Sequence, residues 1–184
     1  MPRLARGWLV GIGAVLATVA AGGSLSHPSA PESSPAVEIA RLKADLEQLR
    51  GRLPDQSHVM KDVAYHFTNL WFAARAGNWP LAAFYLEETR SHLRWAVRVI
   101  PVRRTSAGAL DLRPILDGLD RTVFSDLEKT VKGRDAGGFP ERYRRALVGC
   151  YSCHQAAEKP YLRPRIPEQP EARIIDFDPN ATGP

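Results

Sequence analysis

The fold is decided by residues 55–100, DQSHVMKDVAYHFTNLWFAARAGNWPLAAFYLEETRSHLRWAVRVI. These residues contain a single glycine, Gly77, and a single proline, Pro80. Such sparing use of helix breakers favours long helices. Gly77 is expected to end a first helix over roughly 55–76. Asn78 is expected to cap a second helix that carries Pro80 in its first turn and stops before Pro101.

Both expected helices are amphipathic. The first places a set of apolar side chains on one face at 3.6 residues per turn, namely Met60, Val63, Phe67, Leu70, Trp71 and Ala74. The second separates a charged side from an apolar side. The charged side carries Glu87, Arg90, Arg94 and Arg98, and the apolar side carries Leu81, Phe84, Tyr85, Trp95 and Val99.

Two more helices are expected after Pro101. Residues 111–131 repeat leucine or valine at helical spacing, at Leu112, Leu116, Leu119, Val123 and Leu127. A last helix begins near Gly138 and aligns Tyr143, Leu147, Cys150 and His154. No stretch alternates apolar and polar residues with period two, so no sheet is expected. The sequence thus predicts an all-α protein, an antiparallel up-down-up-down four-helix bundle over residues 55–159.

The N-terminal residues resemble an export signal. Arg3 and Arg6 precede an apolar run of 14 residues over 8–21, and small residues follow up to residue 23. This layout predicts a signal peptide over residues 1–23, or an uncleaved signal anchor that tethers the chain to the inner membrane through residues 8–21. In either case the chain is expected in the periplasm.

The segments beside the bundle have distinct compositions. Residues 24–35 are a flexible linker rich in proline and serine. Residues 36–53 form an amphipathic helix with a coiled-coil stripe at Ile39, Leu42, Leu46, Leu49 and Leu53, which either packs on the bundle or pairs in a homodimer. Residues 160–184 are an irregular, proline-rich tail. The tail is expected to cross the bundle surface through Tyr161, Leu162, Ile174, Ile175 and Phe177.

Composition narrows the range of functions. The chain has 184 residues, of which 44% are hydrophobic and 24% charged, typical of a globular domain. Its net charge of +5 includes Arg3 and Arg6 of the targeting segment. The remaining charge is too mild to suggest nucleic-acid binding. No acid–base or nucleophile constellation is apparent, so the chain is not expected to be an enzyme.

The only two cysteines lie in the motif Cys150-Tyr-Ser-Cys153-His154. C-x-x-C-H is the attachment motif of c-type haem, in which two thiols on one helix face form thioethers and the adjacent histidine ligates the iron. A zinc site would need further ligands. A thioredoxin-like dithiol would stand at a helix N-terminus after a strand. These two readings, and a structural disulfide, stay open as alternatives to haem c.

A single C-x-x-C-H near the end of the last helix of an exported bundle resembles the class II c-type cytochromes, the cytochrome c′ group and its low-spin relatives. The resemblance covers about residues 55–159 and rests on Cys150, Cys153 and His154. It implies one haem c, with His154 as proximal iron ligand. In such a bundle the first helix begins beside the end of the fourth, so Met60 is the candidate distal ligand and His58 the alternative.

Other residues around the haem are expected on charge and position. Trp95 and Arg98 are candidates for the haem pocket, with Arg98 near the propionates. Glu88 and His92 are four residues apart on one helix face, and a hydrogen bond between them is expected. A second metal site is less favoured, because the sequence contains no second carboxylate–histidine pair to supply the other ligands. His66 lies too far along its helix to reach the haem and is expected to be packed or at the surface.

Three functions follow from these readings. The first is one-electron transfer by an exported monohaem cytochrome, whose redox partner has an acidic docking surface that matches the basic stretch from Glu87 to Arg104. The second is a five-coordinate haem protein that binds NO or CO. The third is a haem-free helical interaction module held near the membrane.

Overall fold

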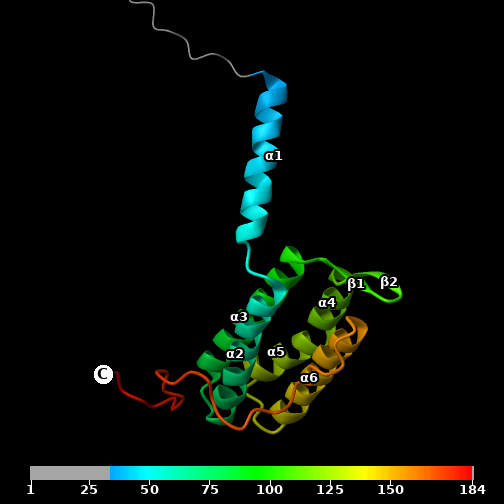
Figure 1. Ribbon diagram of the computed structural model, residues 1–184. Helices are drawn as coiled ribbons and strands as arrows, with labels where there is room; N and C mark the ends of the chain where they lie inside the picture. Colours follow the sequence, from blue (N-terminus) through cyan, green and yellow to red (C-terminus); the bar gives the residue numbers. More distant parts are fainter. Residues whose placement is uncertain (1–33, 184) are drawn as a thin grey trace, which may run out of the picture. The chain divides into compact units, whose positions relative to one another are not determined.

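The computed structural model describes residues 34–183, and most of them are helical, which confirms the predicted helical class. The helices are α1 Pro35–Arg52, α2 Gln56–Arg75, α3 Trp79–Val99, α4 Arg113–Leu119, α5 Ser125–Lys132 and α6 Phe139–Ala156 (Figure 1). The predicted signal segment and most of the predicted linker lie outside the described residues. None of the helices in residues 34–183 has the length and apolar character needed to cross a membrane.

The chain divides into two units, and the division falls between Asp45 and Leu46, inside α1. Pro35 is the first residue of α1, one residue before the predicted start at residue 36, and the backbone N–H of Val37 donates to Ser34 Oγ over 3.4 Å. No residue of α1 is buried. The predicted apolar stripe is accordingly exposed to solvent, at Ile39, Leu42, Leu46, Leu49 and Leu53.

Helices α2 and α3 form an antiparallel pair whose ends match the sequence pattern (Figure 1). The Asp55 carboxylate caps α2 by accepting from the His58 N–H at 2.9 Å. The Asn78 side chain caps α3 by accepting from the Leu81 N–H at 3.2 Å. Between the helices Gly77 adopts φ +75°, a left-handed conformation that a side chain would strain. Local capping and one glycine therefore fix this turn.

The predicted apolar side of α3 is partly wrong. Phe84 is 53% exposed and Trp95 37% exposed. The α3 side chains that are buried in the protein are Ala82, Tyr85, Leu86, Thr89 and Ala96. The reason is that α3 packs against α2 on one side and α5 on another, so the buried arc is rotated away from Phe84 and Trp95.

A two-stranded hairpin follows α3, where no sheet was expected. Strand β1 (Val102–Thr105) pairs with β2 (Gly108–Asp111) in antiparallel register, and Gly108 adopts φ +120° at the turn. Strands of four residues are too short to show a period-two pattern. The hairpin is tied to the end of α6, because the Ser106 N–H donates to Glu158 Oε1 at 2.8 Å.

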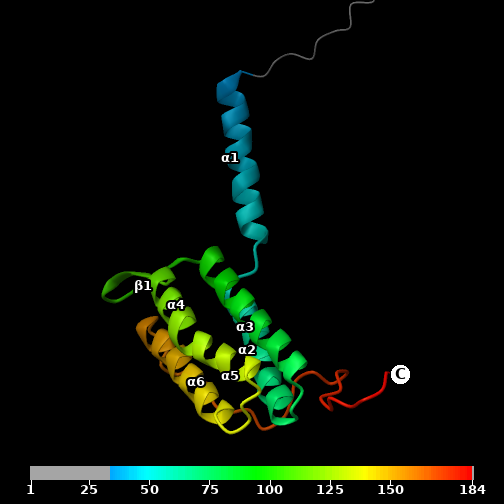
Figure 2. The ribbon, with the colours of Figure 1, turned by 180° about the vertical axis from the view of Figure 1, so that it is seen from behind.

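The single helix expected over residues 111–131 is also wrong in detail. Asp111 belongs to β2, and a π-helical segment, η1 (Asp120–Phe124), separates α4 from α5 (Figure 2). In a regular α-helix, two residues that are eight positions apart point in directions that differ by about 80°. A π turn rotates less per residue, so it reduces this difference. Asp120 and Glu128 therefore reach one partly buried guanidinium, that of Arg90 on α3, each at 2.7 Å. The sequence placed Arg90 on the charged side of its helix but did not indicate these two partners.

Aromatic side chains join α2 to α6. The rings of Phe67 and Tyr143 stack with centroids 4.4 Å apart, and the Tyr143 hydroxyl donates to the Phe67 carbonyl at 2.8 Å. One turn further, Trp71 meets Phe139 with centroids 5.8 Å apart. These contacts show that α2 and α6 run antiparallel. The surrounding core also contains Leu70, Phe124, Leu127, Val131 and Ala146.

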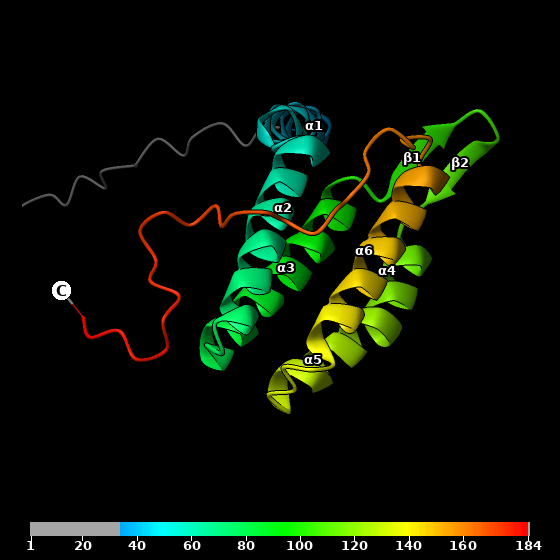
Figure 3. The same ribbon diagram turned by 90° about the horizontal axis from the view of Figure 1, so that it is seen from below.

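The tail after α6 has no regular secondary structure and crosses the helices (Figure 3). Its contacts with the core come from Ile166, Ala172 and Phe177. Of the contacts expected, Phe177 is confirmed, but Tyr161, Leu162, Ile174 and Ile175 are exposed. The tail is held instead by a polar side chain. The buried Oδ1 of Asn69 accepts from the Glu171 and Ala172 N–H groups, each at 3.0 Å.

Replacing Asn69 with alanine is expected to loosen the tail. The change leaves two backbone N–H groups without their acceptor, at a cost of about 1–3 kcal/mol in the free energy of unfolding. Trypsin should then cleave after Arg173 faster than in the unmodified chain, as followed by mass spectrometry. Thr68→Ala is the control, because Thr68 makes only an exposed 3.4 Å contact with Glu171. Equal cleavage rates in the two variants would contradict the role of Asn69.

Candidate functional site

The C-x-x-C-H motif occupies the last turns of α6. Cys150 and Cys153 are free, partly buried cysteines three residues apart on the helix, and Cys150 packs against the core. A side-chain carbon added to Gly149 would lie 2.7 Å from Leu119 Cδ2, so α6 approaches α4 closely there. The motif lies at the end of the helical unit where α2 begins and α3 ends (Figure 1).

Burial governs the chemistry of both thiols. Burial raises the pKa of the Cys150 thiol to about 12, and it also raises that of Cys153. Both side chains are therefore protonated thiols at neutral pH. A thioredoxin-like dithiol needs the opposite, a lowered thiol pKa near a helix N-terminus. The environment of these cysteines argues against that alternative.

His154 is oriented by the chain that follows it. Its Nδ1 lies 2.8 Å from the backbone carbonyl oxygen of Leu162. A carbonyl oxygen only accepts hydrogen bonds, so Nδ1 carries the proton and Nε2 keeps its lone pair. Histidine ligands of metals are usually held in this way by a second hydrogen bond. A turn places Leu162, because its N–H donates to the Lys159 carbonyl at 3.0 Å.

The antiparallel register relates Met60 to the motif. Phe67 lies level with Tyr143 and Trp71 level with Phe139. Because both helices rise about 1.5 Å per residue, Met60, seven residues before Phe67, lies level with Cys150, seven residues after Tyr143. Met60 is half-buried.

His58 is less well placed to bind a metal beside the motif. Its side chain is 73% exposed, and its Nδ1 lies 2.9 Å from the Asp55 carboxylate. The same carboxylate caps α2, and hydrogen bonds from Ser57 and then His58 hold the pKa of Asp55 well below its usual range. His58 thus belongs to the N-terminal cap of α2, whereas Met60 shares a helix face with Val63 and Phe67, which are buried.

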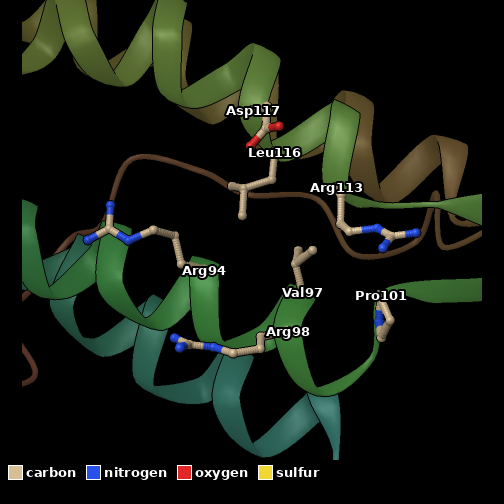
Figure 4. Close-up of a pocket in the computed structure, with 7 residues that line it drawn as sticks. All are labelled: Arg94, Val97, Arg98, Pro101, Arg113, Leu116 and Asp117. Carbon is tan, nitrogen blue, oxygen red and sulfur yellow. The ribbon is translucent and has the colours of Figure 1, made fainter.

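An arginine-rich hollow lies between α3 and α4, at the same end of the unit (Figure 4). Its volume is about 370 Å³, and Val97 and Leu116 form part of its apolar wall. Three arginines border it, Arg94, Arg98 and Arg113, together with Asp117. Arg94 is paired with Glu87 and Arg113 with Asp111, whereas Arg98 forms no ion pair within the described residues. An unpaired guanidinium beside an apolar wall suits an apolar group that carries a carboxylate, because guanidinium groups bind carboxylates in bidentate geometry. The cysteines are not among the residues that line the hollow.

The two residues predicted for the pocket border one hollow together. Trp95 and Arg98 line it with Ser91 and His92. Arg98 also borders the arginine-rich hollow, whereas Trp95 does not. Arg113 and Leu116 were not anticipated, because the β-hairpin that brings α4 back to α3 left no pattern in the sequence.

His66 is half-buried among aromatic rings, which agrees with the packed role expected of it. It faces Glu88 and His92 across the α2–α3 pair, and one ligand atom from each of the three lies within 4.8 Å of the others. Among the described residues this is the only such group of three, and it excludes Cys150, Cys153 and His154. The sequence did contain a signal: His66 lies 11 residues before Gly77 and Glu88 lies 11 residues after it. Residues equidistant from the turn of a helical hairpin face one another.

Comparison with models of protein families, with curated proteins and with solved structures finds no match for this chain. The function must therefore be argued from the geometry of the motif and its surroundings.

Proposed function

We propose that this chain is an exported monohaem c-type cytochrome that transfers one electron at a time, and that its helical unit is an up-down-up-down four-helix bundle of the class II cytochrome kind. The observation that carries the proposal is the 2.8 Å contact of His154 Nδ1 with the Leu162 carbonyl, which leaves Nε2 free beside Cys150 and Cys153. Export rests on the signal predicted over residues 1–23.

The cysteines and the histidine would hold the haem. Cys150 and Cys153 are three residues apart on α6, which suits two thioether bonds to one macrocycle. His154 directly follows Cys153 and would offer Nε2 to the iron, while Leu162 keeps the proton on Nδ1. Haem bound here would supply the Fe(III)/Fe(II) couple.

Residues from other helices would complete the environment. Arg98 borders the arginine-rich hollow and, among the described residues, forms no ion pair, so it would neutralise a propionate. Arg94 and Arg113 also border the hollow but are paired with Glu87 and Asp111. Met60 lies level with Cys150 and carries a thioether, the side chain that completes six-coordinate iron in electron-carrying c-type cytochromes. A low-spin, six-coordinate iron suits electron transfer better than binding of small gases.

The decisive experiment is the intact mass of the chain produced together with the haem-attachment machinery of a bacterial periplasm. We expect one haem to remain on the chain after extraction with acidified acetone, because thioethers survive that treatment. The double variant Cys150→Ala, Cys153→Ala should release all of its haem. A wild-type chain with the mass of the bare polypeptide would refute the proposal.

The basic surface suits an acidic redox partner. Arg90 is paired with Asp120 and Glu128, and Arg94 with Glu87. Among the described residues, Arg103 and Arg104 of the hairpin form no ion pair, so their charge is available to a partner.

We therefore expect Arg103→Gln, Arg104→Gln to slow oxidation of the ferrous protein by ferricyanide, an anion, on the order of tenfold at low salt. Oxidation by a cationic cobalt complex should not slow. The control is Arg144→Gln, Arg145→Gln, an equal charge change on the exposed face of α6. Screening with salt should abolish the difference, since the Debye length is about 8 Å at physiological ionic strength. Equal effects of the two double variants would leave the hairpin no role in docking.

A further inference from the structure

Three potential metal ligands from α2 and α3 converge outside the C-x-x-C-H motif. His66 lies on α2, and Glu88 and His92 lie one turn apart on α3. One ligand atom from each lies within 4.8 Å of the other two. The imidazole rings of His66 and His92 have centroids 4.8 Å apart and an interplanar angle of 35°. Because α2 and α3 pack along their length, the three side chains stand on a rigid pair of helices.

The hydrogen bonds leave nitrogen lone pairs available. His92 Nδ1 lies 2.8 Å from the Glu88 backbone carbonyl oxygen, so it carries the proton and leaves Nε2 as a free ligand atom. His66 Nδ1 is buried and has no hydrogen-bond partner. Buried polar atoms in folded proteins nearly always have a partner, and an orphan calls for an explanation.

Neither Arg90 nor Arg94, the arginines of α3 nearest to Glu88 in sequence, pairs with the Glu88 carboxylate. On α3, Arg90 binds Asp120 and Glu128, and Arg94 binds Glu87. Among the described residues, Glu88 therefore has only His92 as a partner, at 3.7 Å. Burial, and after it the nearby His92, lowers the pKa of His66, whereas Glu88 and Asp62 act in the opposite direction.

We propose that His66, Glu88 and His92 form a binding site for one divalent transition-metal ion, of which zinc is the representative. Two imidazole nitrogens and one carboxylate oxygen form a ligand set typical of zinc with an open position, whereas calcium and magnesium prefer oxygen alone. Tetrahedral zinc ligands on bonds of about 2.1 Å stand about 3.4 Å apart. The three ligand atoms, which lie within 4.8 Å of one another, would approach one another to reach that spacing.

Solvent can reach the proposed metal site. His92 also borders a hollow of about 430 Å³, together with Ser91, Trp95 and Arg98. His66 and Glu88 are not among the residues that line this hollow, so a metal ion would enter from the side of His92.

The test is a titration of the full chain with Zn²⁺, without a polyhistidine tag, followed by competition with a chromophoric chelator. The two cysteine thiols are blocked by attached haem or, in chain without haem, by alkylation with iodoacetamide. Zinc bound at this site is therefore counted whether or not the chain is a cytochrome. We expect one equivalent to bind. X-ray absorption at the zinc edge should show nitrogen and oxygen neighbours and no sulfur.

Single variants test each ligand. His66→Asn, Glu88→Gln and His92→Asn should each weaken zinc binding at least about 100-fold, since loss of an outer-shell partner alone costs about 10- to 100-fold. Glu87→Gln is the matched control, because Glu87 is the neighbouring carboxylate and is paired with Arg94; its affinity should equal that of the wild type. If a histidine variant does not fold, the zinc affinity of Glu88→Gln tests the proposed site, because Glu88 is only half-buried. Absence of saturable binding, or equal affinity in Glu88→Gln and Glu87→Gln, would overturn the proposal.

Discussion

Replacing His154 with alanine in the haem-loaded protein is expected to remove the low-spin ferrous spectrum almost completely, while the haem stays attached through Cys150 and Cys153. The reason is the orientation of the imidazole: the Leu162 carbonyl oxygen accepts a hydrogen bond from Nδ1–H at 2.8 Å, which leaves the lone pair of Nε2 free. We expect sharp α and β bands in the reduced wild type and broad, high-spin bands in the variant.

Two additions make this result specific to His154. Gln155→Ala changes the next residue, which is exposed at the end of α6, and should leave the spectrum unchanged. Free imidazole supplies the missing nitrogen and should restore part of the low-spin spectrum of His154→Ala. If the ferrous spectrum of His154→Ala equals that of the wild type, another residue is the proximal ligand.

Replacing Met60 is expected to change the spin state of the iron, and it distinguishes an electron carrier from a gas binder. Met60 lies level with Cys150 in the antiparallel register of α2 and α6. A thioether ligand gives six-coordinate, low-spin iron, whereas an open position leaves high-spin iron that accepts small ligands. Met60→Ala should therefore convert the protein to a high-spin form that takes up CO readily, as followed by absorption after flash photolysis.

Met60→Leu separates ligation from simple blocking of the position. Leucine fills a similar volume but offers no lone pair. If Met60 is the ligand, both variants become high-spin. If Met60 only blocks the site, the wild type is already high-spin, Met60→Leu binds CO at the wild-type rate, and Met60→Ala binds it faster. A low-spin spectrum that survives both substitutions would exclude Met60 and point to His58.

Much of the helical fold could be predicted because the signals were local. Asn78 caps α3 through its own side chain, and Gly77 takes the left-handed conformation that ends the α2–α3 turn. Both effects act within a few residues, so the sequence predicts the ends of α2 and α3 to within about two residues. The C-x-x-C-H motif is local as well, and its position on a helix followed from the spacing of Tyr143 and Leu147.

The parts of the fold that could not be predicted depend on contacts between residues that are far apart in the sequence. The π turn at Asp120–Phe124 lies where Arg90, 30 residues earlier, binds Asp120. The tail docks through Asn69, which lies about 100 residues before Ala172. Neither pairing leaves a periodic pattern in the sequence.

The residues of the candidate sites also differ in whether the sequence could predict them. The two cysteines and His154 could be recognised because they are close together in the sequence. The Leu162 carbonyl could not, because its role comes from a backbone turn and any residue would supply the same oxygen. His66 was assigned a packing or surface role because it was considered along α2 alone, whereas its neighbours Glu88 and His92 come from α3.

Because helix α1 buries no residue, its helix content is expected to follow the helix–coil equilibrium of an isolated helix. It is 18 residues long and rich in alanine, leucine, glutamate and arginine, and the Arg50–Glu47 pair at 2.6 Å spans one of its turns. Isolated helices below about 12–15 residues are marginal in water because nucleation is costly. At 18 residues α1 lies just above this limit and should fray gradually on warming, in a sloping circular dichroism baseline before the main transition. If two copies pair along the exposed stripe, that slope should flatten as protein concentration rises.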